Sequence, residues 1–291
     1  MDFNKYYEDR QKLVNTFLEK CLEKKGISRV DEAMAYSLLA GGKRIRPIIL
    51  MATADALGVG GYNFLPVACG LEMIHTYSLI HDDLPCMDDD EYRRGRLTNH
   101  KVFGEAMALL AGDALLTLAF EVMLEQKNVP AEVLVETVRE VAMCAGNFGM
   151  VGGQVIDLDS EGRQISEEEL RKLHAGKTGA LFIAAVRSGA RLSGAASDEL
   201  LALTKFADLL GLAFQITDDI LDVEGDAAQM GKAAHSDEKK HKSTYVTLYT
   251  LEGAKALAQK TVDEALGCLE MFGENAEALR EITKMMCGRK S

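Results

Sequence analysis

Two acidic clusters, each at the end of an apolar stretch, constrain the fold of this chain most strongly. The first covers residues 82–90 and follows an apolar run from about residue 65, and the second covers residues 218–222 and follows a run from about residue 200. Neighbouring carboxylates repel one another unless cations lie between them. Because both clusters directly follow stretches that read as buried helices, we expect them to share one divalent-metal site.

The spacing within the first cluster requires a break in its helix. Asp82 and Asp88 are six residues apart, so a regular helix would point their side chains about 120° apart. Pro85 removes a helical hydrogen bond and restricts the residue before it. We therefore expect the helix to kink or end near Pro85, which would bring Asp88 back towards Asp82.

The second cluster needs no such break, because Asp218 and Asp222 are spaced i, i+4 and share a helix face. Oxygen ligands without a set of cysteines or histidines favour magnesium over zinc. Magnesium usually keeps several waters and is completed by substrate phosphates, so a diphosphate ligand is expected. The alternative is two solvated acidic turns, which would explain a single cluster better than it explains two.

Composition favours a helical protein. The 291 residues are 47% hydrophobic, with only 4 prolines and no tryptophan, and long stretches are rich in Ala, Leu, Glu and Lys. No stretch shows the alternation of a strand and no segment resembles a linker, so we expect one all-α domain over residues 1–291. The expected helices are residues 2–25, 30–40, 48–57, 65–84, 103–123, 130–151, 166–174 and 200–221, with more after 244.

Charge and cysteine usage exclude several partners. The net charge of -12 argues against nucleic acid. No run reaches the roughly 18–20 apolar residues of a membrane span, and the N-terminus lacks the apolar region of a signal peptide. The 6 cysteines are scattered without metal or redox spacing, as in reduced thiols. We expect a cytoplasmic protein that binds a small anionic molecule through local cations or metal ions.

Three segments carry such cations. Residues 41–47 place two glycines before Lys43 and Arg46 at a helix start, where backbone N–H groups also attract anions, although an ordinary basic turn explains them equally well. Lys177 lies among glycines and is expected to point inwards at a kink. The polar residues 224–241, which include Lys232, are a candidate lid or a solvated loop.

His75 lies on the same helical stripe as Asp82. A single histidine at such a position is more often a core residue than a functional one.

In order along nearly the whole chain, these blocks resemble the trans-isoprenyl diphosphate synthase family. The first aspartate motif is similar to that of bacterial farnesyl and plant-type geranylgeranyl diphosphate synthases. The resemblance rests on residues 42–47, Asp82 and Asp83 with Asp88, residues 93–95, Gly153 and Gln154 with Asp157, Lys177 and Thr178, Gln215 with Asp218, Asp219 and Asp222, Gly231 and Lys232, and residues 242–245.

The resemblance implies an isoprenoid synthase fold, which is a helical bundle around a deep central active-site cavity. It implies a homodimer, formed through residues 103–123, and three Mg²⁺ ions in each active site. The implied metal site consists of Asp82, Asp88 and Asp218 as ligands, with Asp83 and Asp222 supporting them. The allylic diphosphate would contact Arg93, Lys177, Thr178, Gln215 and Lys232, and isopentenyl diphosphate would contact Lys43, Arg46, His75 and Arg94.

By this resemblance, the reaction is a head-to-tail prenyl transfer that begins with ionisation of the allylic substrate. Metal ions and cations stabilise the leaving diphosphate, and a dry cavity protects the carbocation. The proton is then lost to the released diphosphate, so no side chain need act as the general base. The implied catalytic residues are Asp82, Asp88, Lys177, Thr178, Gln215 and Asp218.

Product length is implied by the residues before the first aspartate. In the family an aromatic residue five positions earlier forms the cavity floor, and here that residue is Tyr77, with Ser78 beside it. Five residues correspond to about 7.5 Å of helix, which leaves room for a short chain only. By the resemblance, Tyr77 therefore favours a fifteen-carbon product. The helical wheel alone places Ser78, not Tyr77, on the Asp82 stripe.

The chain departs from the family at Leu97 and Val246, where proline is usual, and at His235, where glycine is usual. None of these changes removes a charged group. Three alternatives to a farnesyl diphosphate synthase stay open: a geranylgeranyl diphosphate synthase, a non-catalytic subunit of a heteromeric synthase, and a class I terpene cyclase. The non-catalytic subunit would typically lack one aspartate motif, and the cyclase would not need Lys43 and Arg46.

Overall fold

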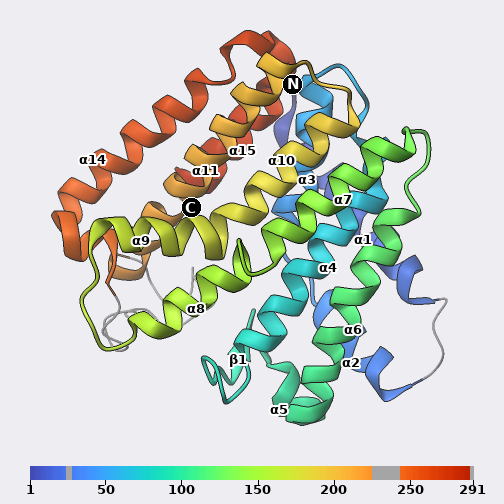
Figure 1. The fold of residues 1–291 in the computed structure, drawn as a ribbon, viewed down its shortest axis with the longest axis vertical. Helices are drawn as coiled ribbons and strands as arrows, with labels where there is room; N and C mark the ends of the chain where they lie inside the picture. The colour runs from blue at the N-terminus through green and yellow to red at the C-terminus, as the bar shows by residue number, and fades with distance from the viewer. Residues whose placement is uncertain (24–27, 225–242, 289–291) are drawn as a thin grey trace.

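The computed structural model describes residues 1–23, 28–224 and 243–288, and this part of the chain is almost entirely helical (Figure 1). The predicted all-α class is therefore confirmed. The helices are α1 (Phe3–Glu23), α2 (Arg29–Leu38), α3 (Ile45–Ala56), α4 (Leu65–Asp82), α5 (Asn99–Phe103), α6 (Glu105–Leu124), α7 (Ala131–Ala145), α8 (Met150–Ser160), α9 (Glu167–His174), α10 (Ala180–Leu192), α11 (Ser197–Glu224), α14 (Tyr245–Gly267) and α15 (Glu277–Cys287), with short helical turns η1 (Gly61–Phe64), η2 (Ala175–Gly179) and η3 (Glu270–Ala276).

Side-chain caps fix the starts of several helices. Ser166 accepts a hydrogen bond from the backbone N–H of Glu169, whose carboxylate accepts one from Ser166 in return. This reciprocal capping box is the one that the sequence predicts for α9. Thr244 forms an equivalent box with Thr247 at the start of α14.

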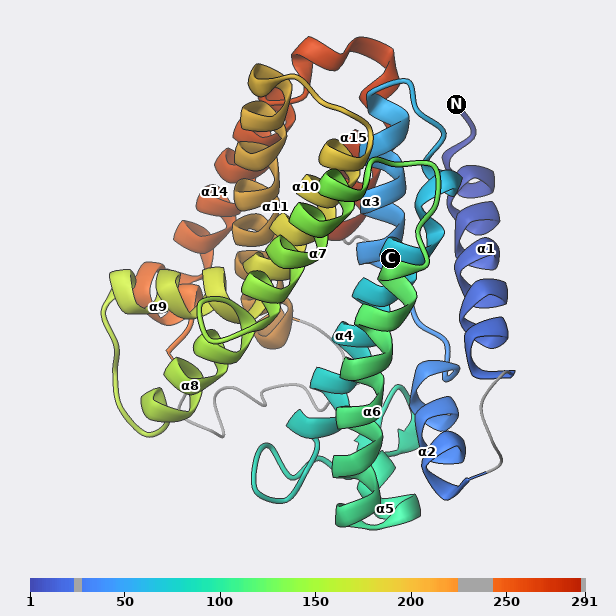
Figure 2. The same cartoon turned by 45° about the vertical axis from the view of Figure 1, so that its right-hand side comes forward.

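Helices α4 and α11, which carry the two acidic clusters, are the centre of the bundle. Helix α4 packs along α6 and also against α3, whereas α11 packs along α14 and α10. In both views, α4 and α11 run towards the same side of the bundle (Figures 1 and 2). Most residues of α4 are buried, as expected for a helix that has apolar side chains on all sides. The C-terminal ends of both helices are therefore held by a rigid core.

Several features differ from the sequence-based expectation, and three of them lie near the site. The expected helix 130–151 is divided, because α7 ends at Ala145 and α8 begins only at Met150, after a turn around Gly146 and Gly149 that is not helical. Helix α4 ends at Asp82, before Pro85. A hairpin of two short strands, β1 (Tyr92–Arg93) and β2 (Arg96–Leu97), was not expected, because two-residue strands show no alternation.

Two helices among the described residues are long and apolar enough to cross a membrane by length and composition alone. They are α6 and α11, and in each the apolar window is 44% buried inside the protein. Both helices pack against neighbouring helices of the bundle, α6 against α4 and α11 against α14.

Candidate functional site

The first acidic cluster begins where α4 ends. Asp82 is the last residue of α4, and the chain turns at Pro85 so that the backbone N–H of Asp88 donates to the carbonyl oxygen of Asp82 at 2.9 Å. The expected reversal is therefore present. Burial raises the pKa of Asp82, the Asp88 and Asp83 charges add to this, and the Lys177 ammonium opposes it. Several carboxylates are thus held together beside the cations Lys177 and Arg93.

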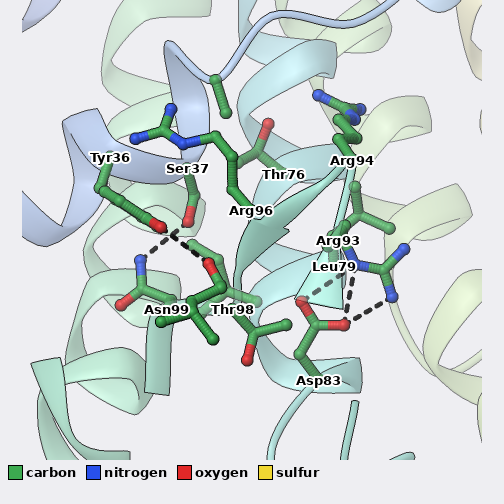
Figure 3. Close-up of a pocket in the computed structure, with 13 residues that line it drawn as sticks. Tyr36, Ser37, Thr76, Leu79, Asp83, Arg93, Arg94, Arg96, Thr98 and Asn99 are labelled. Atoms are coloured by element: carbon green, nitrogen blue, oxygen red, sulfur yellow. Dashed lines mark hydrogen bonds and ion pairs between the residues drawn. The ribbon is translucent and has the colours of Figure 1, made fainter. Parts of the chain in front are cut away.

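Asp83 makes a two-pronged ion pair with Arg93 of the β1 strand (Figure 3). The Nη2 and Nε atoms of Arg93 lie 2.6 and 2.8 Å from Oδ1 of Asp83. The Asp83 side chain is only 5% exposed, so this pair fastens the hairpin to the end of α4. The resemblance gave Asp83 a supporting role at the metal site and Arg93 a diphosphate contact, and in the structure these two side chains form an ion pair.

A cation faces the Asp82 side of the site from η2, a single π-helical turn. Its Lys177 Nζ lies 2.6 Å from Oδ2 of Asp157 on α8. A side chain at Gly153 would overlap the backbone of Lys177, so the two backbones can approach only because this residue is glycine. The expected inward-facing lysine at a kink is confirmed, and Thr178 follows it on the same turn.

The second acidic cluster lies within α11, which continues to Glu224. Gln215, Asp218 and Asp222 are spaced i, i+3 and i+7, so they share one helix face. Asp222 is buried and Asp218 is exposed. Asp219 is buried and accepts a hydrogen bond of 2.7 Å from the backbone N–H of Tyr245, the first residue of α14. The candidate lid that follows, with Lys232 and His235, lies outside the described residues.

The cations of the basic segment before α3 lie in different environments. Gly41 and Gly42 adopt φ of +83° and +127°, which glycine tolerates best. Arg44 is buried and pairs with Glu72 at 2.9 Å. Arg46 is different, because its Nε is buried without a hydrogen-bond partner and burial lowers its pKa to about 10. Lys43 is exposed.

His75 lies near Arg46 and Arg94. Burial lowers the pKa of His75 well below its ordinary value, and the Arg46 and Arg94 charges lower it further. The imidazole is therefore neutral and can donate one hydrogen bond to an anion. The side chain of Arg94 reaches back to the carbonyl oxygen of Gly41, which joins the hairpin to the basic segment. The structure thus brings His75, Arg46 and Arg94 together, which are three of the four residues that the resemblance names for isopentenyl diphosphate.

Tyr77 and Ser78 lie one turn and more before Asp82 on α4. Tyr77 is 7% exposed, and burial and then the Asp82 charge raise its pKa. The Ser78 hydroxyl donates to the carbonyl oxygen of His75 at 2.9 Å, within its own helix.

Sequence reasoning did not give a role to Asp157 or Asp219. Both are buried acids in helices beside the site, one paired with Lys177 and the other with the start of α14. Asp157 follows Gly153 by four residues, a signal that is readable only once the partner lysine is known. Within the described residues, no three acidic, histidine or cysteine side chains gather closely enough to hold a metal ion. Any ion here would need ligands from water or a substrate.

The chain is similar to known prenyl-transferring enzymes over nearly its whole length. The polyprenyl synthetase family model matches residues 27–286. The chain is 44% identical over 292 residues to the farnesyl diphosphate synthase of Geobacillus stearothermophilus, covering 99% of this chain and 98% of that relative. It is 43% identical over 288 residues to the geranylgeranyl diphosphate synthase of Cyanophora paradoxa, covering 98% and 96%. The crystal structure of an FPP/GFPP synthase from Zymomonas mobilis aligns with a TM-score of 0.89 at 37% identity, covering 98% of this chain and 99% of that one.

Proposed function

Because the chain belongs to the polyprenyl synthetase family, we infer that it is a prenyltransferase that joins isopentenyl diphosphate to dimethylallyl and then geranyl diphosphate. The product is (2E,6E)-farnesyl diphosphate, with diphosphate released at each step. The observation that carries this proposal is a pair of separate cationic groups near the end of α4. Lys177 faces Asp82, whereas Arg46 and Arg94 surround His75. Two diphosphates require two such groups.

Members of this family use Mg²⁺, and the residues present fit that ion. Asp82, Asp88 and Asp218, supported by Asp222, supply only hard oxygen ligands. The raised pKa of Asp82 reflects burial and carboxylate repulsion, both of which a bound cation would offset. When bound, the ions neutralise negative charge on the departing diphosphate. We propose three per site, and we propose that Asp83 supports the cluster through Arg93.

The allylic diphosphate is expected to lie against Lys177 and Thr178, near Arg93 and Gln215, with Lys232 completing the set from outside the described residues. Asp157 holds the Lys177 ammonium in place. Gln215 and the oxygen atoms of Thr178 provide dipoles that stabilise a carbocation without forming a bond to it.

Isopentenyl diphosphate is expected to bind Lys43, Arg46, His75 and Arg94. The Nε atom of Arg46 supports this assignment, because it is a buried donor without a hydrogen-bond partner and is costly unless a ligand accepts from it. The neutral imidazole of His75 would add a hydrogen bond without adding charge. The proton lost in the condensation passes to the released diphosphate.

Product length is proposed to be set by Tyr77, with Ser78 beside it. The buried ring of Tyr77 lies about one turn from Asp82, close enough for the aspartate charge to raise its pKa. A bulky ring at this depth leaves room for a short chain only.

We propose a cytoplasmic homodimer of one-domain subunits. The outer face of α6 exposes Leu109, Leu110 and Leu124, and α7 next to it exposes Val135 and Met143. A second copy packed on this face would cover these side chains.

The test is incubation of the purified protein with isopentenyl and dimethylallyl diphosphates and Mg²⁺, followed by chromatography of the dephosphorylated products. We expect farnesol as the main product, and no product when a chelator replaces Mg²⁺. Tyr77→Ala should lengthen the product, and an unchanged product would exclude Tyr77 as the floor. Absence of any prenyl alcohol would contradict the function itself.

The second candidate is a geranylgeranyl diphosphate synthase, favoured by the similarity to the Cyanophora paradoxa enzyme. The same experiment separates the two, because a twenty-carbon main product would replace farnesol.

A further inference from the structure

The α4 face that meets α6 carries a side chain to which the proposed reaction assigns no role. His81 directly precedes Asp82, and its ring meets the ring of Tyr77 edge-on, with centroids 5.5 Å apart at 84°. Its Nε2 lies 3.0 Å from the carbonyl oxygen of Leu109 on α6. A hydrogen bond to a carbonyl requires Nε2 to carry the proton, which fixes the tautomer.

Gly112 on α6 leaves room for the imidazole ring of His81, because glycine has no side chain. A side chain at Gly112 would overlap the Nε2 and Cδ2 atoms of His81. The carboxylate of Asp113, which is 60% exposed, lies 3.9 Å from Nε2 on the outer side. The imidazole is therefore held between its own helix and the backbone of α6.

We propose that His81 is a positioning residue that holds the Tyr77 ring in place and thereby limits the length of the product. This inference rests on the proposed function, in which Tyr77 forms the cavity floor. A tyrosine ring turns about two side-chain bonds, and an edge-to-face partner removes part of that freedom. If His81 is lost or displaced, the Tyr77 ring can move into the space beside α6, and the cavity becomes deeper.

Two variants on different helices test this. His81→Ala removes the ring, and Gly112→Ala displaces it. Because the overlap at Gly112 involves only a side-chain end, the ring can yield, and alanine favours a helix more than glycine does. For both variants we expect the ratio of twenty-carbon to fifteen-carbon product to rise about tenfold, the size of effect that one aromatic pair can exert. A loss of packing alone would lower kcat or stability without changing this ratio.

The double variant sharpens the test. Once His81 is alanine, the methyl group of Gly112→Ala overlaps nothing, so it should add no further change to the product ratio. Additive effects of the two substitutions would show that they act separately, and would overturn the proposal.

Two further variants serve as controls. One is the same glycine-to-alanine change at another site, and the other replaces His81 by a different aromatic residue. Gly267→Ala on α14 makes the same chemical change where no atom lies within 4 Å, so its product ratio should equal that of the wild type. His81→Phe keeps a ring beside Tyr77 and should retain mainly fifteen-carbon product. If His81→Ala, Gly112→Ala and the wild type give the same ratio, the proposal is wrong, whereas a wild type without prenyl products would contradict the proposed function instead.

Discussion

The two acidic clusters differ in how the backbone brings their carboxylates together. In the first, α4 ends at Asp82 and the chain turns back, so that Asp88 arrives through a backbone hydrogen bond to Asp82. In the second, α11 continues through the cluster, and Asp218 and Asp222 meet by helical repeat alone. The geometry of a continuous helix is set by its own backbone hydrogen bonds. A chain reversal also depends on contacts with neighbouring segments.

The adjacent aspartate pairs show where that support comes from. Each pair contains one deeply buried member, Asp83 or Asp219, both 3% exposed. Asp83 holds Arg93 and thus the hairpin, whereas Asp219 holds the first backbone N–H of α14. The comparison teaches that the second aspartate of each pair holds a neighbouring segment, the hairpin through Arg93 or the start of α14 through Tyr245.

The largest expected effect separates the first aspartates from the second in catalysis. Asp82→Asn and Asp218→Asn should each lower kcat by about 10³-fold, because each removes a charge that the transition state requires. Asp83→Asn and Asp219→Asn should lower kcat much less. Steady-state kinetics at saturating Mg²⁺ measures all four. If Asp83→Asn were as inactive as Asp82→Asn, the division between metal ligand and anchor would be wrong.

The next effect concerns the stability of the first anchor. Asp83→Ala should lower the free energy of unfolding by about 2–4 kcal/mol, because the partly buried Arg93 guanidinium is left without its main carboxylate. Urea unfolding measures this change. Asp90→Ala is the matched control, since Asp90 lies 3.6 Å from Arg93 and is more exposed, and it should cost little. Equal losses for the two variants would mean that Asp83 is no anchor.

The contact of Asp219 with α14 should contribute somewhat less to the free energy of unfolding than the contact of Asp83 with Arg93 does. Asp219→Ala removes one charge-assisted hydrogen bond to a backbone N–H, and we expect a loss of about 1.5–3 kcal/mol. Asp219→Asn keeps an oxygen acceptor and should recover much of that stability. Hydrogen exchange of the Tyr245 amide gives a local measurement, and unchanged protection in Asp219→Ala would contradict the role of this contact.

Much of the fold was predictable from the sequence. The helical class, the capping box at Ser166 and the turn after α4 follow from local rules, namely helix propensity, capping and the effect of Pro85. The break at Gly146–Gly149 was not predicted, because the apolar pattern continues through it. The close approach of α8 to η2 at Gly153 is a tertiary contact, and it was not predicted either.

The candidate site was predictable in its residue types but not in its pairings. These contacts depend on which segments become neighbours in the fold. Examples are the pairs Asp83–Arg93 and Asp157–Lys177, and the packing of His81 on Gly112. Spacing shows which residues share a helix face, and it cannot show which residue of another helix faces them. The helical wheel also placed Tyr77 away from the Asp82 stripe, and in the structure its ring contacts His81, four residues later on the same helix.

The smallest expected effect is a difference in pH dependence between the first aspartates. Burial raises the pKa of Asp82 above its ordinary value, although Lys177 opposes this. A raised folded-state pKa means that the folded protein binds the proton more tightly than the unfolded chain does. The stabilisation that comes from protonated Asp82 is therefore fully present below the pKa of Asp82 in the unfolded chain. It is lost as the pH rises through the pKa of Asp82 in the folded protein.

It follows that ionised Asp82 destabilises the metal-free protein at neutral pH. Asp82→Asn should then raise the free energy of unfolding in chelator by about 0.5–2 kcal/mol, while Asp218→Asn, at an exposed position, should not. The gain should disappear towards about pH 4, where the wild-type carboxyl is protonated. Thermal unfolding across this pH range, with chelator and with Mg²⁺, measures both. If Asp218→Asn stabilised the protein as much as Asp82→Asn, burial would not be what distinguishes the two clusters.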